Sequence, residues 1–342
     1  MRPTLLTDRS DRSRFEITGA HAVATLNGLV TNDVAALRTG HGQYAAVLTA
    51  KGKIVADVVV LMVGDTLQLH ASAEAGPGLH AMLVKFINPR FATLRDVTAD
   101  TFDLSLVGGD ASAVVELATR NGSSQNGIAE GEPGAGVVTR DTLAELAPYS
   151  HIAAVIGGVQ VRIISLTPIG STGERVFSVT GEREQVAAVR SALQAAGARD
   201  ADRSVLDTMR VESGIPAWGT DMDDSTLPQE ANLDDMHAVS YTKGCYIGQE
   251  TVARIHFRGH VNKSLRRLEF SGEELPPRGA VLEDDEHRSV GDVRSTARSE
   301  LHGLIGIGMV RREVADGATI RVHWEGGGST ATVAGKAKGA IN

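Results

Sequence analysis

The residues with the most versatile chemistry occupy one short segment, residues 243–250, which has the sequence KGCYIGQE. It contains Cys245, the only cysteine among 342 residues, placed two residues after Lys243 and five before Glu250. A neighbouring cation can lower the pKa of a thiol and make it a nucleophile or a metal ligand. A lone cysteine can equally be a small buried apolar residue. The two glycines allow a positive φ or a close approach of the backbone to a ligand. The residues alone leave both interpretations of Cys245 open.

Basic side chains gather in residues 243–267, where Glu250 is the only acid, although the whole chain has a net charge of −8. This local reversal of charge predicts a site for an anion, such as a phosphate or a carboxylate-rich cofactor tail. Two alternatives remain open: nucleic-acid bases stacked on nearby aromatic rings, and outward-facing residues of a surface strand. The basic residues are Lys243, Arg254, Arg258, Lys263, Arg266 and Arg267, with His256 and His260; the aromatic ones are Tyr241, Tyr246 and Phe257.

Asp57 interrupts the most apolar run of the chain, residues 54–63. A buried carboxylate without a partner costs several kcal/mol. Either this strand has one hydrated face, or the carboxylate faces a cavity in which it meets a hydrogen-bond partner. The surroundings of Asp57 in the folded chain decide between these two interpretations.

Two other charged groups need an explanation. Arg210 and Glu212 lie two residues apart on a predicted helix, and residues with this spacing do not face each other. The pair therefore meets two different surroundings.

The acids Asp221, Asp223 and Asp224 lack the glycine and the terminal glutamate of a calcium loop, and we interpret them as a solvated acidic loop.

Composition restricts the class of protein. A hydrophobic content of 42% and a charged content of 22% are typical of soluble globular proteins, and 342 residues predict two to three domains. One cysteine excludes an internal disulfide framework and four-thiolate iron–sulfur ligation by one chain. No apolar run is long enough to cross a bilayer, and the N-terminus lacks the features of a signal peptide, so we expect a cytoplasmic protein. We find no phosphate-binding loop, no dinucleotide fingerprint and no zinc motif, and we predict no metal site.

Hydrophobic periodicity predicts α+β structure up to about residue 261 and a small barrel or sandwich of short strands after it. Residues 121–136 have no apolar period and are rich in Gly, Ser and Pro, so we expect a mobile surface insertion. Strands are expected at residues 43–48, 54–63, 66–72, 101–107, 159–166, 174–180, 265–270, 304–310, 319–324 and 330–333; helices are expected at 77–87, 111–120, 182–196 and 202–213.

Residues 243–250, together with TVAR at 251–254, resemble the signature of the YgfZ family of folate-binding proteins. These are relatives of the glycine cleavage system T-protein, an aminomethyltransferase. Other segments carry the same resemblance in the family's order, and together the motifs run from residue 29 to 254. They are LVTNDV at 29–34, KGK at 51–53 followed by Asp57, RVESGIP at 210–216, and LPQE at 227–230.

The resemblance implies a T-protein-like, three-lobed ring. Two interleaved α+β lobes (1–261) and a C-terminal β-barrel (262–342) surround a cavity that binds tetrahydrofolate or a one-carbon derivative of it. The resemblance also implies an accessory role in the assembly or repair of iron–sulfur enzymes, including a radical enzyme that methylthiolates tRNA. The expected partners are folate and iron–sulfur client proteins, without a membrane. The acidic net charge argues against direct nucleic-acid binding.

The candidate site residues follow from the matched motifs. Glu174 lies in TGE at 172–174, which matches an element that holds the pterin in T-proteins. T-proteins carry two adjacent acids where this chain has Ala56 and Asp57, and they lack the motif at 243–250. The alternative function is a folate-dependent one-carbon transferase, either aminomethyl-transferring or demethylating. Candidate catalytic residues are Cys245 and Asp57; candidate cofactor-binding residues are Asp57, Glu174, Arg210, Lys243, Tyr246, Gln249 and Arg254.

Overall fold

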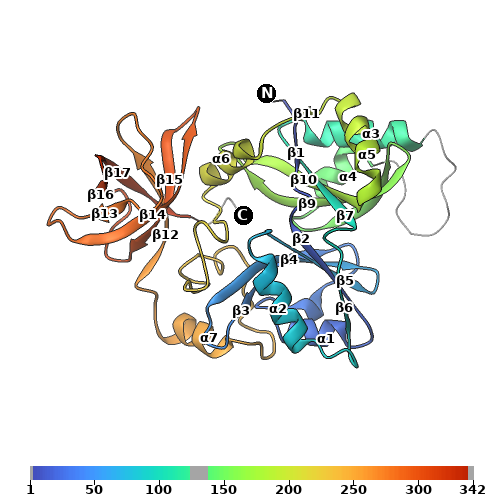
Figure 1. The fold of residues 1–342 in the computed structure, drawn as a ribbon, viewed down its shortest axis with the longest axis horizontal. Helices are drawn as coiled ribbons and strands as arrows, with labels where there is room; N and C mark the ends of the chain where they lie inside the picture. Colours follow the sequence, from blue (N-terminus) through green and yellow to red (C-terminus); the bar gives the residue numbers. More distant parts are fainter. Residues whose placement is uncertain (1–2, 124–137, 338–342) are drawn as a thin grey trace.

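The computed structural model describes residues 3–123 and 138–337, which form three lobes around a common junction (Figure 1). The first lobe contains a five-stranded sheet, the second contains a six-stranded sheet, and the third is a closed barrel. The first two lobes contain helices as well as sheets, so the expected α+β architecture with a C-terminal barrel is confirmed.

The first lobe has the strand order β3-β4-β5-β2-β6, with antiparallel pairing throughout. Side chains alternate along β4 because successive residues of a strand point to opposite faces. Ala56 and Val58 enter the core of this lobe, whereas Val59 packs on the opposite face against the junction between lobes. The elements are β2 (Ser13–Thr18), α1 (Ala22–Asn27), η1 (Val34–Ala36), β3 (Gly42–Leu48), β4 (Ile54–Val63), β5 (Thr66–Ala71), α2 (Gly76–Phe86) and β6 (Thr93–Asp96).

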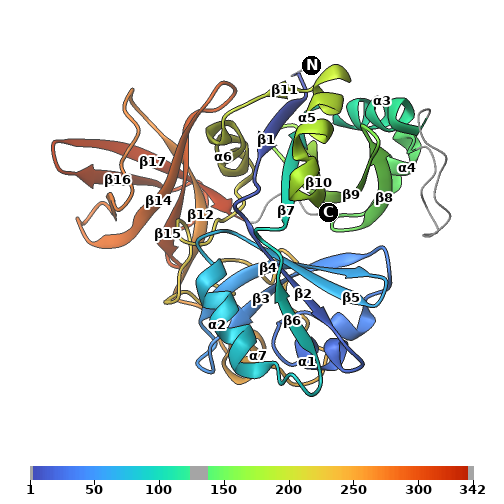
Figure 2. The same cartoon turned by 45° about the vertical axis from the view of Figure 1, so that its right-hand side comes forward.

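The second lobe has the strand order β11-β1-β7-β10-β9-β8. Because β1 precedes β2 in sequence, the chain starts in the second lobe, crosses to the first through residues 9–12, and returns between β6 and β7. The two lobes are therefore interleaved, as Figure 2 shows. The elements are β1 (Leu5–Asp8), β7 (Thr101–Val107), α3 (Ala111–Ser123), α4 (Arg140–Glu145), β8 (His151–Ile156), β9 (Val159–Ile169), β10 (Glu174–Glu182), η2 (Arg183–Gln185), α5 (Val186–Ala195) and β11 (Arg199–Asp200).

Two helices connect these lobes to the barrel. Helix α6 (Arg203–Ser213) contacts the barrel strand β14, and α7 (Gln249–Arg258) precedes the first barrel strand. A hydrophobic core at the junction contains Ile54 from the first lobe, Val211 from α6 and Ile307 from the barrel, so it fixes the three lobes against each other. The barrel strands are β12 (Lys263–Phe270), β13 (Val281–Glu283), β14 (Ser289–Ser299), β15 (Gly303–Arg311), β16 (Thr319–Trp324) and β17 (Gly327–Lys336).

Local sequence signals found most of the long elements. The expected strands at 54–63 and 101–107 match β4 and β7. The helix expected at 202–213 matches α6, where Asp202 is the N-cap and accepts a hydrogen bond from the Ser204 amide. The expected insertion at 121–136 lies outside the described residues except for 121–123, which belong to α3. The surface-strand interpretation of the basic stretch is wrong over α7, which is helical. In β12 it is right for Lys263 and Arg267, which are exposed, and wrong for Arg266, which is buried.

Candidate functional site

A cavity of about 570 Å³ lies at the junction of the lobes. Its walls come from β3 and β4 of the first lobe, from β9 and β10 of the second, and from α6 with the loop that follows it. Aromatic side chains, apolar side chains and several charged groups line this central cavity, among them Tyr44, Asp57, Tyr149 and Trp218. Ligand sites commonly combine mostly apolar walls with a few placed polar groups in this way.

Asp57 faces the central cavity from the middle of β4. The Tyr44 hydroxyl donates a hydrogen bond of 2.9 Å to its Oδ2, whereas its Oδ1 is buried and has no partner among the described residues. Burial raises the pKa of Asp57, and the bond from Tyr44 opposes this shift. The Trp218 Nε1 in the cavity wall is likewise buried and unpaired. One acceptor and one donor are therefore left for a polar ligand.

Arg210 also lines the central cavity, but its donors are used within the protein. Its Nη1 donates to Asp221 at 2.7 Å and its Nη2 to Ser295 of the barrel at 3.0 Å, while Nε bonds Asp207. Asp221 is fully buried as the counter-ion of this guanidinium, so the solvated-loop interpretation is wrong for Asp221. Arg210 therefore links α6 to the barrel through its hydrogen bond to Ser295.

Glu212, two residues further along α6, meets different surroundings, as the helical spacing predicts. Its carboxylate accepts hydrogen bonds from Ser299 Oγ of the barrel at 2.7 Å and from the Ser171 amide at 3.3 Å. Ser171 belongs to the turn that leads to Glu174, the first residue of β10. Glu174 Oε2 is buried without a partner among the described residues, although this side chain is not in the cavity wall.

The cysteine segment, residues 243–250, is held on the first lobe. Lys243 Nζ donates three hydrogen bonds, to the carbonyls of Asn27, Val30 and Asn32 at 2.6, 2.8 and 2.7 Å. An ammonium group has three donors, so all of them are engaged. Burial lowers the pKa of Lys243 to about 8, and its Nζ lies 5.2 Å from the centre of the Tyr246 ring.

Gly248 closes this segment with a φ of 85°. A Cβ there would lie 2.6 Å from the Thr49 carbonyl oxygen and 3.1 Å from the Gly52 Cα, so only glycine fits against the β3–β4 turn. Cys245 is exposed. Five predicted site residues come from this segment and α7, and none of them lines the central cavity. They are Lys243, Cys245, Tyr246, Gln249 and Arg254.

Comparison with known proteins gives the family. The model of the GCVT N-terminal domain matches residues 3–131. The aminomethyltransferase of Geobacillus kaustophilus is 30% identical over 320 residues, covering 91% of this chain and 80% of that protein. This chain belongs to the aminomethyltransferase family. The Chlorobium chlorochromatii aminomethyltransferase is 29% identical over 315 residues, covering 90% of this chain and 79% of that protein.

The T-protein fold is confirmed as well. The structure of the glycine cleavage system aminomethyltransferase T from Bartonella henselae superposes with a TM-score of 0.80 at 21% identity, covering 97% of this chain and 85% of that one. The expected three-lobed arrangement is therefore the fold of this family. None of the described helices combines the length and the apolar character that crossing a membrane requires.

Basic residues that the sequence reasoning missed also line the central cavity. Arg9, Arg12 and Arg203 come from the crossing segment between β1 and β2 and from the start of α6. Arg203 forms a bidentate ion pair with Asp11 at 2.6 and 2.7 Å. Burial lowers the pKa of Arg9 to about 10. The available signal was the dense alternation of charge in RSDRSR at 9–14, but only tertiary contacts bring it to the cavity.

His151 joins the two α+β lobes by a bond that depends on its protonation. Its Nε2 lies 3.0 Å from the Met62 carbonyl oxygen and its Nδ1 lies 3.0 Å from Nη1 of Arg162. A guanidinium can only donate, so Nδ1 accepts and Nε2 carries the proton. Burial, with Arg162 beside the ring, lowers the pKa of His151 to about 4.

Acidification from pH 7 to pH 5 is therefore expected to destabilise the fold. The unfolded imidazole, with a pKa near 6.5, takes up a proton that the folded one does not, so stability falls as the pH drops below 6.5. His151 alone should remove about 2 kcal/mol from the free energy of unfolding. Urea unfolding at both pH values measures this loss, which should shrink by that amount in His151→Gln. An equal loss in both proteins would contradict the assignment.

Proposed function

We propose that this chain is a folate-dependent one-carbon transferase that holds tetrahydrofolate in the central cavity, with Asp57 at the reacting part of the ligand. The observation that supports this most directly is that the unpaired Oδ1 of Asp57 and the unpaired Nε1 of Trp218 belong to residues that line the same cavity. A flat heterocycle that carries both donors and acceptors would satisfy both groups. The volume of about 570 Å³ suits a ligand of this size.

The basic groups of the cavity fit the other end of such a ligand. Arg203 is already paired with Asp11, but Arg9 and Arg12 line the same cavity and would attract the carboxylates of a glutamate tail. In this proposal they take the role that the sequence analysis gave to the basic stretch 243–267. The folate supplies nitrogens that carry a one-carbon unit.

The chain itself contributes position and a tuned carboxyl group. Tyr44 fixes Oδ2 of Asp57 by its hydrogen bond, so Oδ1 points to a defined place. Because burial raises the pKa of Asp57, this carboxyl group can hold a proton or give one up at a pH closer to neutral than an exposed aspartate can.

Calorimetric titration with reduced tetrahydrofolate tests the binding step, and formation of methylene-tetrahydrofolate from an aminomethyl donor tests the reaction. We expect saturable binding of one folate per chain together with turnover. Absence of both would reject the proposal, whereas binding without turnover would favour the accessory function described next.

A second candidate is the YgfZ-type accessory role, in which the folate-bound protein supports iron–sulfur enzymes. The observation that favours it is the cysteine segment: Lys243 and Gly248 hold Cys245 exposed, outside the wall of the central cavity. A thiol at that place is accessible to a partner protein rather than to a ligand in the cavity. In this proposal the segment is a contact for iron–sulfur client proteins.

Cys245→Ser separates the two candidates, with Ser271→Ala in the barrel as a surface control. For the accessory role we expect the variant to bind tetrahydrofolate like the wild type, but to leave a deletion strain with low activity of iron–sulfur enzymes and of tRNA methylthiolation. Full rescue by Cys245→Ser would remove the thiol from the accessory role, and unchanged enzyme activities in the deletion strain itself would reject that role.

A further inference from the structure

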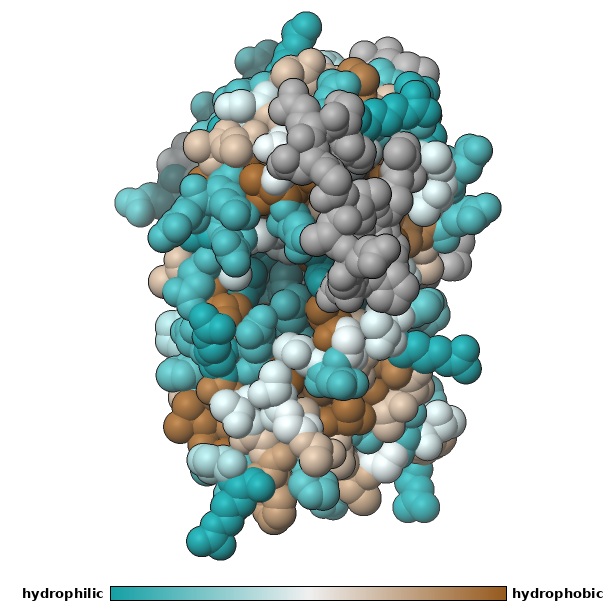
Figure 3. Space-filling view, turned by 90° about the vertical axis from the view of Figure 1, so that its right-hand side faces the viewer, coloured by the Kyte–Doolittle hydropathy of each residue, from teal (hydrophilic) through white to brown (hydrophobic). Residues whose placement is uncertain are grey.

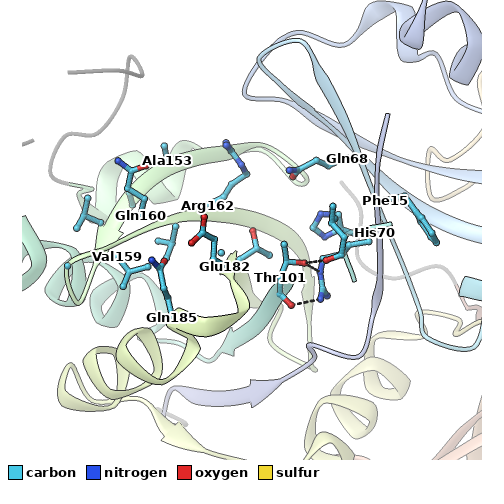
Figure 4. A pocket seen from close by; sticks show the side chains of 18 residues that line it. Phe15, Gln68, His70, Thr101, Ala153, Val159, Gln160, Arg162, Glu182 and Gln185 are labelled. Carbon is cyan, nitrogen blue, oxygen red and sulfur yellow. Dashed lines mark hydrogen bonds between the residues drawn. The ribbon is translucent and has the colours of Figure 1, made fainter. Parts of the chain in front are cut away.

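A second cavity, of about 700 Å³, lies between the two α+β lobes (Figure 4). Its walls are β2 and β5 of the first lobe and β8, β9 and β10 of the second. We call it the lateral pocket. His70 is the one described residue that lines both this pocket and the central cavity. On the side where these two lobes meet, the space-filling view shows a hollow with hydrophilic residues inside it and along one side (Figure 3).

Arg14 gives the lateral pocket a buried positive charge. Its side chain, on a residue only 2% exposed, donates from Nε to Thr101 Oγ1 and from Nη2 to the carbonyls of Ser10, Thr98 and Thr101. Its Nη1 is buried and has no partner among the described residues. Among residues 3–123 and 138–337, Arg14 forms no ion pair, since its hydrogen bonds all go to hydroxyl and carbonyl oxygens. The hydrogen-bond acceptors of this buried cation are therefore neutral oxygens, and Asp103 is the main charge that stabilises it without a direct ion pair.

A second guanidinium increases this excess of charge. Arg183 Nη2 donates to the same two carbonyls as Arg14, those of Ser10 at 2.8 Å and Thr98 at 3.0 Å. Two like charges that share neutral acceptors repel each other. Burial is the main cause that lowers the pKa of Arg14; the charge of Asp103 opposes this shift, and Arg183 adds to it. An anion in the adjacent pocket would relieve this repulsion.

The remaining lining defines the kind of anion. Gln68, Gln160 and Gln185 offer amide groups, and Val97 and Val159 belong to an apolar part of the wall. Glu182 is the one carboxylate among the described lining residues, and it is exposed. In the close-up view, Gln160 and Gln185 lie at the end of the pocket opposite Thr101 and His70 (Figure 4). The pocket is therefore long enough for a charged group at one end and a less polar body along it.

We propose that the lateral pocket is a second ligand site, separate from the folate cavity, that binds a small organic anion with an apolar or aromatic body. Arg14 is its charged anchor, and the glutamine amides bind the rest of the ligand. Carboxylates and phosphates share the chemistry that this site recognises. Phenyl phosphate, benzoate and inorganic phosphate are therefore the probes, and benzamide is the neutral control.

Calorimetric titration of the full chain with these probes tests the proposal. We expect phenyl phosphate or benzoate to bind at least tenfold more tightly than benzamide, and more weakly as the salt concentration rises. Inorganic phosphate should bind more weakly than phenyl phosphate, because it lacks the apolar body. Equal affinity for benzamide and benzoate, or no binding of any probe, would overturn the proposal.

Isosteric substitutions at the rim locate the binding without disturbing the buried residues. Glu182→Gln removes the negative charge and should tighten phenyl phosphate binding about threefold to tenfold, and Gln160→Glu should weaken it by a similar factor. Thr319→Glu, on an exposed barrel position, adds the same charge far away and should change nothing. Identical affinities in Glu182→Gln and Gln160→Glu would contradict the assignment.

The two sites can be tested independently. Asp57→Asn should leave phenyl phosphate binding unchanged, and saturating tetrahydrofolate should not displace the probe. Displacement by folate would show that the probe occupies the central cavity, and would overturn the proposal of a second site. Failure of the chain to bind folate would reject the function proposed above and leave this result intact.

Discussion

Asp57→Asn is expected to lower one-carbon turnover by about 10²- to 10⁴-fold, the range typical of a lost acid–base group. The amide keeps the size of the carboxyl group and an oxygen that can accept from the Tyr44 hydroxyl. It cannot exchange a proton at neutral pH or carry the charge that a bound ligand would meet. Turnover with saturating tetrahydrofolate measures the loss.

The same substitution should increase stability. Burial raises the folded pKa of Asp57, so the folded protein favours the protonated form, and the ionised form costs stability at pH values above that pKa. Removing the charge should therefore raise the free energy of unfolding at pH 7 by about 1 kcal/mol. Loss of activity together with a gain in stability is the signature of a functional carboxylate. A large loss of stability would instead identify Asp57 as a structural residue.

Tyr44→Phe is the matched control for this experiment. It removes only the hydroxyl that donates to Oδ2 and leaves the carboxyl group in place. Without that donor the pKa of Asp57 should rise further, because the bond now opposes the effect of burial. We expect a smaller loss of turnover and a shift of the pH profile to higher pH. An unchanged profile would contradict the role of Tyr44 in orienting and tuning Asp57.

Lys243→Met is expected to cost about 4 kcal/mol of folding free energy, because one buried and two partly buried carbonyls lose a charged donor at once. Those carbonyls belong to Asn27, Val30 and Asn32, around the end of α1 in the first lobe. The methionine fills the space of the aliphatic stem but cannot donate. The segment 243–250 should then detach from the first lobe. Urea unfolding measures the stability, and limited proteolysis should detect faster cleavage in this segment.

Lys263→Met is the control, because Lys263 is an exposed lysine at the start of β12. Its loss should change the free energy of unfolding by less than about 0.5 kcal/mol. If Lys243→Met were as stable as this control while losing folate affinity, Lys243 would be a ligand-binding residue, as the sequence analysis expected, rather than the anchor of its segment.

Local sequence was sufficient for the elements whose signals lie within a few residues. The β-branched run of β4 predicts a strand with one charged interruption, and Asp202 with Gly214 predicts both ends of α6. The helical spacing of Arg210 and Glu212 likewise predicts that they meet different partners. These inferences hold because strand alternation, helix capping and helix periodicity depend on neighbours along the chain.

The site required contacts that no local pattern contains. Lys243 and Asn27 are 216 positions apart, and their contact uses an amine that the sequence suggested for a ligand. Arg14 becomes a buried cation only because Thr98 and Thr101 fold back over it. Sequence determined which residue types were available and in what order. The packing of three lobes decided which of them face a cavity, because burial and the pairing of donors with acceptors are set by distant parts of the chain.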